Sequence, residues 1–172
     1  MSSHPRQRNY FPADAVEFAE FASTAPPFIK PVRRSGRKLQ GLKYERKAHD
    51  YLEARYGSLF LRGPWLRFRL AGDPRLQWCQ PDGIYFDLPR GQITIVEIKY
   101  NHTADAWFQL TSLYLPVLLR LFPEELWKFA CIEMVKWYDC ATTVPKPVKL
   151  RPSVCAARPG EFGVYIWRPG DD

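Results

Sequence analysis

The chain has 172 residues, of which 46% are hydrophobic and 15% aromatic, which predicts one globular domain with a sizeable core and excludes a disordered protein. No apolar run approaches the roughly 20 residues that cross a bilayer, and the first residues lack the apolar segment of a secretory signal, so we expect a cytoplasmic protein with no membrane partner. A formal net charge of +7 favours a nucleic-acid partner, although a merely soluble basic protein would carry the same charge.

Residues 1–37 are expected to form an N-terminal arm that is partly irregular and basic. Within it, Asp14–Ala22 has apolar residues at helical spacing and predicts a short helix, which the following prolines end. The arm finishes in a basic run that contains four candidate phosphate contacts: Arg33, Arg34, Arg37 and Lys38. A solvated loop is the alternative interpretation of this run.

A helix is predicted over Leu39–Tyr56, with Gly57 as its C-terminal cap. Its apolar face includes two polar side chains, Glu45 and His49. A buried carboxylate is costly unless it is paired or binds a metal, so Glu45 is either a metal ligand or the partner of a nearby cation at the edge of that face. We expect His49 to be a core residue or a neighbour of a site rather than a ligand.

Two lysines and two arginines beyond the arm are further candidates for phosphate contacts. Lys43 and Lys47 lie off the apolar face of the predicted helix. In Trp65–Leu70 apolar and polar residues alternate, which predicts a half-buried strand with Arg67 and Arg69 on its polar face. Ordinary solvent exposure is the alternative for the two arginines.

Ile84–Leu88 and Gln92–Tyr100 are rich in β-forming residues, and the Leu-Pro-Arg-Gly sequence between them suits a type I turn, so we predict a hairpin. Because side chains alternate along a strand, Glu97 and Lys99 project from the same face. Asp82 opens the first strand, and pairing across the turn would bring it near Glu97. Two carboxylates beside an amine form an oxygen site for a hard divalent cation; a solvated ion pair and a turn aspartate are the ordinary alternative.

After the hairpin the pattern predicts one more helix and two more strands. Thr103 is a suitable N-cap for the helix, Gln109 is a polar residue in its apolar stripe, and Pro116 is expected to kink it. Phe129–Trp137 predicts a core strand and Phe162–Trp167 an edge strand. Gln109 could simply satisfy a nearby backbone group.

The chain shows no internal repeat and no second domain, so residues 38–172 are expected to form a single domain. Its proline-rich, basic segment at 139–152 predicts an irregular C-terminal extension. The four cysteines are widely spaced and form no C-x-x-C pair: Cys79, Cys131, Cys140 and Cys155. We therefore expect reduced thiols of a cytosolic protein rather than disulfides or a zinc site.

The order Pro81-Asp82, a short gap, then Glu97-Ile98-Lys99 on a hairpin resembles the motif of the PD-(D/E)XK nuclease superfamily. Gln109 on the next helix is similar to the glutamine of its RecB-type and phage exonuclease-type members. The gap from this glutamine to Tyr114 is one residue longer than in RecB-type members, so only Gln109 is carried over. The resemblance covers roughly residues 38–137 and implies an α/β, restriction-endonuclease-like αβββαβ core with a central mixed sheet flanked by helices.

The resemblance further implies a Mg²⁺-dependent deoxyribonuclease that hydrolyses phosphodiester bonds, with Mn²⁺ as a possible substitute. The implied metal ligands are Asp82, Glu97, the backbone carbonyl of Ile98, and Glu45 as an outer or second-metal ligand. The implied catalytic residues are Lys99, Asp82, Glu97 and Gln109. Lys99 would position or deprotonate the attacking water and stabilise negative charge, and Gln109 would orient Lys99 or the water.

Two other functions remain open from the sequence. A protein on the same fold could bind nucleic acid without cleaving it, although the intact acids and lysine argue against this. A role in a larger assembly is also open, because the terminal extensions could bind a protein partner or a second copy of the chain. A small nuclease with such extensions suits a phage or mobile element, acting in the host cytoplasm, by analogy alone. The chain has no base-reading motif, so we expect recognition of nucleic-acid structure or ends.

Overall fold

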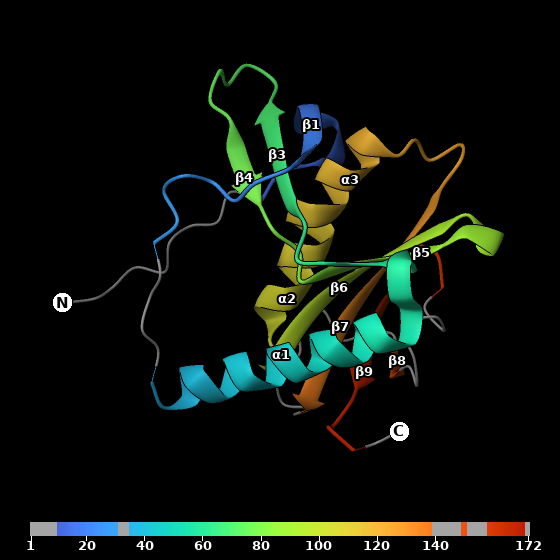
Figure 1. The fold of residues 1–172 in the computed structure, drawn as a ribbon. Coiled ribbons are helices and arrows are strands. Elements are labelled where there is room, and N and C mark those ends of the chain that lie inside the picture. Colours follow the sequence, from blue (N-terminus) through green and yellow to red (C-terminus); the bar gives the residue numbers. More distant parts are fainter. Residues whose placement is uncertain (1–9, 31–34, 139–148, 151–157, 171–172) are drawn as a thin grey trace.

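Two β-sheets and three helices make up the part of the chain that this computed structural model describes, residues 10–30, 35–138, 149–150 and 158–170 (Figure 1). The main sheet has the strand order β2 (Phe60–Arg62), β5 (Gly83–Asp87), β6 (Gln92–Asn101), β7 (Lys128–Trp137), β9 (Phe162–Ile166) and β8 (Lys149–Leu150). The second sheet has the order β1 (Val16–Ala22), β3 (Trp65–Leu70) and β4 (Gln77–Cys79). The helices are α1 (Arg37–Tyr56), α2 (Ala104–Gln109) and α3 (Leu115–Leu121). The fold is mixed α/β, as the sequence predicts.

The hairpin β5–β6 forms the centre of the main sheet. β5 and β6 pair antiparallel through a 3-10 turn at Leu88–Arg90, and Gly91 closes the turn in the left-handed conformation that glycine favours (φ 57°). β6 then pairs parallel with β7, and β7 pairs parallel with β9. A parallel pair needs a crossover connection, and α2 and α3 supply it between β6 and β7. The predicted hairpin is confirmed, and the sheet is mixed.

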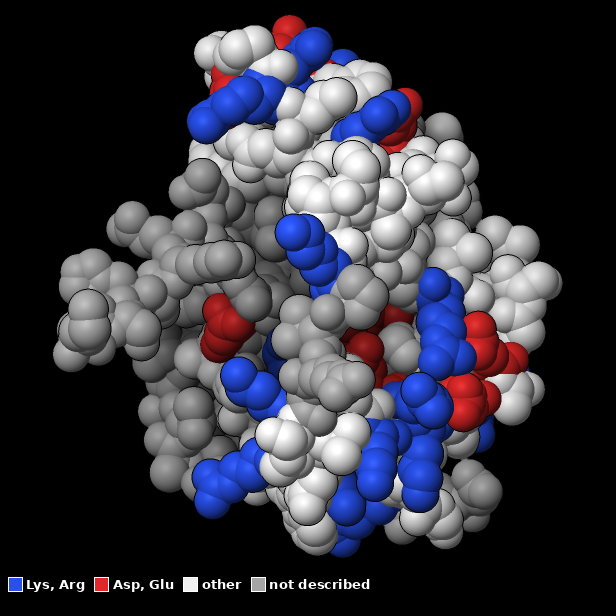
Figure 2. All heavy atoms as spheres, turned by 60° about the vertical axis from the view of Figure 1, so that its left-hand side comes forward, with Lys and Arg blue, Asp and Glu red and all other residues white. Residues whose placement is uncertain are grey.

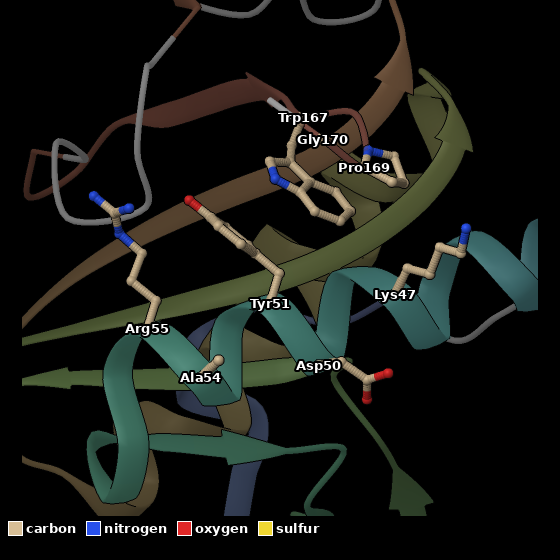
Figure 3. A pocket seen from close by; sticks show the side chains of 8 residues that line it. All are labelled: Lys47, Asp50, Tyr51, Ala54, Arg55, Trp167, Pro169 and Gly170. Atoms are coloured by element: carbon tan, nitrogen blue, oxygen red, sulfur yellow. The ribbon is translucent and has the colours of Figure 1, made fainter. Parts of the chain in front are cut away.

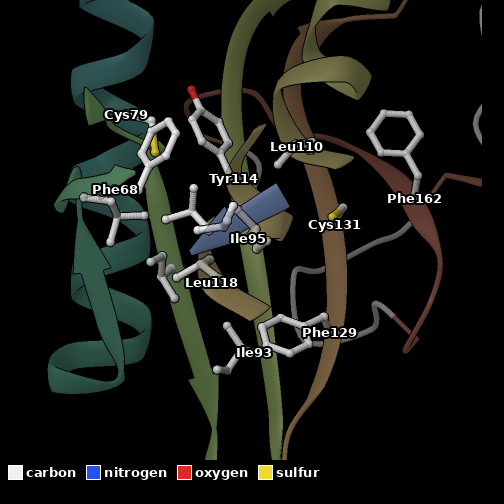
Figure 4. Packing of buried hydrophobic residues seen from close by; sticks show 14 of the residues in the cluster. Phe68, Cys79, Ile93, Ile95, Leu110, Tyr114, Leu118, Phe129, Cys131 and Phe162 are labelled. Carbon is white, nitrogen blue, oxygen red and sulfur yellow. The ribbon is translucent and has the colours of Figure 1, made fainter. Parts of the chain in front are cut away.

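The main sheet is covered on both faces, because β6 is apolar on both sides. Ile93 and Ile95 pack with residues of α3 and of the segment before it, such as Leu118 and Leu110 (Figure 4). Val96 and other residues of the opposite face pack with Tyr44, Ala48 and Leu52 of α1. The alternation along β6 therefore places α1 on one face and the α2–α3 connection on the other (Figure 1).

The predicted helix over Asp14–Ala22 is wrong, because this segment forms β1 after a 3-10 turn at Ala13–Ala15. β1 pairs antiparallel with β3, with a register irregularity between Val16 and Phe18 and with Glu20 opposite Arg67. The cross-strand hydrogen bonds and ion pairs outweigh the helical preference of a short alanine- and glutamate-rich segment.

Two strands have places in the sheets that differ from the sequence-based expectation. The αβββαβ order that the resemblance implies would place Trp65–Leu70 in the central sheet. This segment, β3, instead belongs to the second sheet, and the short strand β2 pairs with β5. The segment predicted as an edge strand, Phe162–Trp167, forms β9 between β7 and the two-residue β8. Both differences arise because β2 and β8, with three and two residues, are too short to give a periodic pattern in the sequence and so were not predicted.

A π-helical turn at Leu110–Tyr114 joins α2 to α3, directly before Pro116. The Thr103 side chain accepts a hydrogen bond from the backbone N–H of Ala106, so the predicted N-cap is confirmed. The carbonyl oxygen of Ser112 cannot accept an α-helical hydrogen bond from Pro116, four residues later, which has no N–H. It accepts the N–H of Phe11 instead, at 3.2 Å, which attaches the N-terminal segment to this helix.

Gly83 sits in a space that no side chain can enter without displacing Phe60. A Cβ at Gly83 would lie 2.3 Å from the Phe60 ring. We expect Gly83→Ala to lower the free energy of unfolding by roughly 1–3 kcal/mol through overpacking, measured by urea denaturation. Gly41→Ala is the matched control: a Cβ there meets no atom within 4 Å, and we expect that variant to be neutral or more stable. Equal stability of the two variants would contradict the packing at Gly83.

Two of the four cysteines and most of the proline-rich segment cannot be compared with the sequence-based expectations. Cys79 and Cys131 are free and buried, whereas Cys140 and Cys155 lie outside the described residues. Most of the proline-rich segment at 139–152 lies outside them too. Among the residues that the structure describes, no helix is long and apolar enough to cross a bilayer.

Candidate active site

Asp82 and Glu97 converge where the β5–β6 hairpin opens. The ladder pairs Gly83 with Val96, so Asp82, one residue earlier, lies beside the position of Glu97 on the neighbouring strand. The N–H of Ile98 donates a hydrogen bond of 2.6 Å to Asp82 Oδ2, which holds the carboxylate against β6. The hairpin register therefore produces the pair of acids that the sequence predicts.

The Lys99 ammonium contacts Glu97 directly, with 2.6 Å between Nζ and Oε1. Burial by itself would lower the pKa of Lys99, but the charge and hydrogen bond of Glu97, with the charge of Asp82, raise it above its ordinary value. Lys99 is therefore a partly buried, protonated amine next to two carboxyl groups. In this state it can donate hydrogen bonds and stabilise negative charge, but it cannot accept a proton.

Asp82 holds a proton more tightly than an ordinary aspartate. Burial is the largest cause of its raised pKa, the negative charge of Glu97 is the second, and Glu45 adds to both. The Ile98 N–H and Lys99 oppose these effects without cancelling them. Burial, together with the neighbouring acids, thus disfavours the ionised form of Asp82, and a cation bound beside it would stabilise that form.

α1 contributes Glu45 and His49 to the same place. His49 Nε2 lies 2.7 Å from the carbonyl oxygen of Asp82, and since a carbonyl only accepts, Nε2 is the donor. Burial, the largest cause, lowers the pKa of His49, so its ring is neutral at pH 7. This contact fits the expectation that His49 is a neighbour of the site rather than a ligand: it fixes the backbone that carries Asp82.

A cavity of about 360 Å³ opens onto these residues. It is lined by Glu45, His49, Arg62, Gly63, Gln80 and Asp82. Figure 2 shows Asp and Glu side chains at the bottom of a recess near the centre of one face, with Lys and Arg side chains around and below it. An anion that enters such a recess meets cations first and the carboxylates last, which suits a phosphate group held together with a metal ion.

Glu133 is a functional candidate that the sequence analysis missed. It is fully buried in β7 and lies directly opposite Glu97 in the parallel register. Its Oε2 is 2.5 Å from His102 Nδ1, and its Oε1 accepts the N–H of Thr103 at 3.0 Å. Burial raises the pKa of Glu133, while Thr103, His102 and Lys99 act against that rise. The sequence feature that could have identified Glu133 is a single acid within an otherwise apolar strand, Cys-Ile-Glu-Met-Val.

Gln109 contacts Tyr114, the residue that the sequence analysis set aside. Its Nε2 lies 3.3 Å from the Tyr114 hydroxyl, and its Oε1 has no hydrogen-bond partner among the described residues. The π-helical turn between them explains the unusual spacing, because i and i+5 residues face each other in a π-helix as i and i+4 residues do in an α-helix. The turn absorbs the extra residue, so the two side chains meet despite the longer spacing.

The candidate phosphate contacts divide into three groups. Arg67 and Arg69 are engaged in the second sheet, where Arg67 pairs with Glu20 and Arg69 with Glu17 at 3.3 Å. These carboxylates of β1 neutralise the charges of the two arginines, whose role as nucleic-acid contacts stays a prediction. Four remain exposed on α1: Arg37, Lys38, Lys43 and Lys47. Two lie outside the described residues: Arg33 and Arg34.

Comparison of the chain with protein-family models, with curated proteins and with solved structures found no match. Within the described part of the chain, no three His, Cys, Asp or Glu side chains are grouped so that they could hold a metal ion together. The acids at the site are the pair Asp82 and Glu97, with Glu45 as a more distant charge. A cation bound there would need water or substrate oxygens to complete its coordination, as Mg²⁺ commonly does.

The raised pKa of Asp82, caused by burial and by the charge of Glu97, predicts that Asp82→Asn is more stable than the parent in metal-free buffer. The folded-state pKa is raised above the unfolded value of about 4, so ionising this carboxyl costs stability as pH rises above 4. The asparagine keeps an acceptor for the Ile98 N–H. We expect the melting temperature to rise by roughly 3 °C at pH 8 and not at pH 4, measured by calorimetry. An equal rise in melting temperature at both pH values would show that ionisation of Asp82 is not the cause. Mg²⁺ should raise the melting temperature of the parent and not of the variant.

Proposed function

We propose that this protein is a metal-dependent nuclease with a restriction-endonuclease-like core. The observation that carries the proposal is the meeting of Asp82, Glu97 and Lys99 at the open end of one hairpin, beside a recess rimmed by basic side chains. The element order supports it: α1, then the adjacent strands β2, β5 and β6, then the α2–α3 crossover and β7. This is the αβββαβ order that the resemblance implies.

The residues present fit a Mg²⁺ ion. Asp82 and Glu97 would hold it, with the backbone carbonyl of Ile98 as a further oxygen ligand and Glu45 nearby. One or two carboxylates suffice for Mg²⁺, and the excess negative charge at Asp82 is the feature that a divalent cation would neutralise. When bound, the ion would supply a water of lowered pKa and positive charge for the phosphate oxygens.

The chain's own groups have separate roles in the proposed hydrolysis. The Lys99 ammonium donates hydrogen bonds to the attacking water or to a phosphate oxygen and stabilises the charge that develops there. His49 and the Ile98 N–H fix the backbone and the carboxylate of Asp82. Gln109 and Tyr114 form one hydrogen-bonded unit on the face of β6 from which Lys99 projects. The raised pKa of Lys99 favours its positioning role over its role as a base.

The basic residues on the exposed side of α1 and the net charge of +7 favour nucleic acid as the substrate, with DNA as the first choice.

The test is a panel of single-stranded, double-stranded and branched DNA and RNA incubated with Mg²⁺. We expect cleavage of at least one form by the parent and by Glu124→Ala, an exposed acid in a loop, and none with EDTA or by Glu97→Ala. Cleavage by Glu97→Ala at the parental rate would refute the proposal. Binding without cleavage by the parent would favour a non-catalytic module.

A further inference from the structure

A strip of basic and aromatic side chains runs across α1 and the ends of β6 and β7. It contains two adjoining pockets that share Lys47 and Pro169. The larger, of about 660 Å³, lies between α1 and the segment after β9, with Tyr51, Arg55 and Trp167 among its lining residues (Figure 3). The smaller, of about 290 Å³, is lined by Gln40, Lys43, Tyr44, Lys47, Tyr100, Lys136 and Pro169. The two pockets are separate from the cavity at Asp82.

Cations lie over aromatic rings at the open end of this strip. Lys136 Nζ is 5.1 Å from the centre of the Tyr100 ring and 5.4 Å from that of Trp137. The Arg168 guanidinium is 4.6 Å from the Trp137 ring centre. Trp137 is nevertheless 44% exposed, which is unusual for so large an apolar side chain. The guanidinium lies over the ring, and we call these two exposed groups the Trp137–Arg168 platform.

The charge of the strip is suited to an anionic ligand. Lys43 and Lys47 are exposed, and neither is paired with a carboxylate of the described chain. The acid that lines the larger pocket, Asp50, accepts a hydrogen bond of 3.1 Å from Arg62 on the other side of α1. Lys43 and Lys47 therefore give the strip positive charge that no neighbouring carboxylate of the described residues neutralises.

The strip begins next to the candidate active site. Lys99 is paired with Val135, and Asn101, two residues further along β6, is paired with Trp137. Two residues of a strand span roughly 7 Å, so the backbone of Trp137 lies about that far along the sheet from the register partner of Lys99. α1 also links the two places, since it supplies Lys43 and Lys47 to the strip and Glu45 to the cavity at Asp82.

We propose that this strip binds single-stranded nucleic acid. Lys43, Lys47 and Lys136 would contact its phosphates, and an unpaired base would stack on the Trp137–Arg168 platform. A single strand is favoured over a duplex because stacking on a protein ring needs a base that is not already stacked between neighbours, and because the two pockets are concave. The proposal extends the proposed function by naming the ligand, but binding to the strip does not require cleavage.

The test measures binding of a labelled oligothymidylate of roughly 16 nucleotides in EDTA, by fluorescence anisotropy. We expect Trp137→Ala to weaken binding roughly 5- to 100-fold and Trp137→Phe to restore most of it. Lys43→Ala/Lys47→Ala should weaken binding and reduce its salt dependence. Phe28→Ala and Lys128→Ala, which change an exposed aromatic and an exposed lysine outside the strip, should bind as the parent does. Circular dichroism checks that each variant is folded.

Unchanged binding by folded Trp137→Ala would overturn the proposal. So would a parent that binds the matching duplex as tightly as the single strand, or one that binds poly-glutamate as tightly, since the strip would then be a general polyanion surface. Glu124→Ala, which changes an exposed loop acid outside the strip and outside the candidate site, should retain full binding of the oligothymidylate. Binding is measured in EDTA and cleavage in Mg²⁺, so a failure of the proposed cleavage can be distinguished from a failure of this binding.

Discussion

Lys99→Ala should slow phosphodiester cleavage by roughly 10²- to 10⁴-fold at saturating substrate. The ammonium group lies 2.6 Å from Glu97, and the neighbouring negative charges keep its pKa high, so it is charged throughout the range from pH 6 to 9 in which a nuclease would be assayed. Its removal takes away a cation that contacts Glu97 and whose charge also acts on Asp82. Single-turnover cleavage with excess enzyme measures the chemical step without product release.

The same substitution has a structural consequence that must be separated from the catalytic one. Lys99→Ala leaves the almost fully buried Glu97 without the ammonium group that contacts it, so some loss of stability is expected. Lys99→Met/Glu97→Gln removes both charges and should regain that stability while it stays inactive. Lys128→Ala, an exposed lysine at the start of β7, is the matched control and should cleave normally. A folded Lys99→Ala protein that cleaves within threefold of the parental rate would rule out the assigned role.

The second large effect is expected at the buried pair of Glu133 and His102. His102→Ala should lower the free energy of unfolding by roughly 3 kcal/mol at pH 8, because it leaves a fully buried carboxylate without the imidazole at 2.5 Å. The pKa of Glu133 is raised by burial, so at pH values below about 4 the carboxyl is protonated in both the folded and the unfolded state. The loss should therefore be smaller at pH 4 than at pH 8. Urea unfolding at the two pH values measures the difference.

A double-mutant cycle isolates the contact from other effects of the substitution. Glu133→Gln removes the charge but keeps acceptor oxygen for the Thr103 N–H, so His102→Ala should cost much less in the Glu133→Gln background than in the parent. Additive costs would show that the two side chains are not energetically coupled. Because Glu133 is paired with Glu97 in the β6–β7 register, a coupled Glu133–His102 pair would also help β7 to hold this part of β6 in place.

Local patterns were sufficient to predict the elements that carry the candidate site. The spacing of apolar residues and Gly57 predicted α1, and the alternation in Gln92–Tyr100 predicted both the strand and the face from which Glu97 and Lys99 project. The hairpin then fixed Asp82 next to Glu97, because a short turn leaves little freedom of register. These features depend on residues that are near one another in the chain.

The features that the sequence did not predict depend on distant partners. β1 is a strand because β3, more than 40 residues away, pairs with it, and the same pairing neutralises Arg67 and Arg69. Glu133 lies beside Glu97 only because β6 and β7 pair in parallel with that register. The contact of Gln109 with Tyr114 needs a π-helical turn, which has no periodic signature of its own over five residues.

Calorimetric titration of the parent, Asp82→Asn, Glu97→Gln and Glu124→Gln with Mg²⁺ and Mn²⁺ tests most directly whether Asp82 and Glu97 share one cation. The account predicts that the parent and Glu124→Gln bind one ion per chain with the same affinity, and that each of the other two variants binds it at least about tenfold more weakly. Parental affinity in both Asp82→Asn and Glu97→Gln, or no binding by the parent, would contradict it.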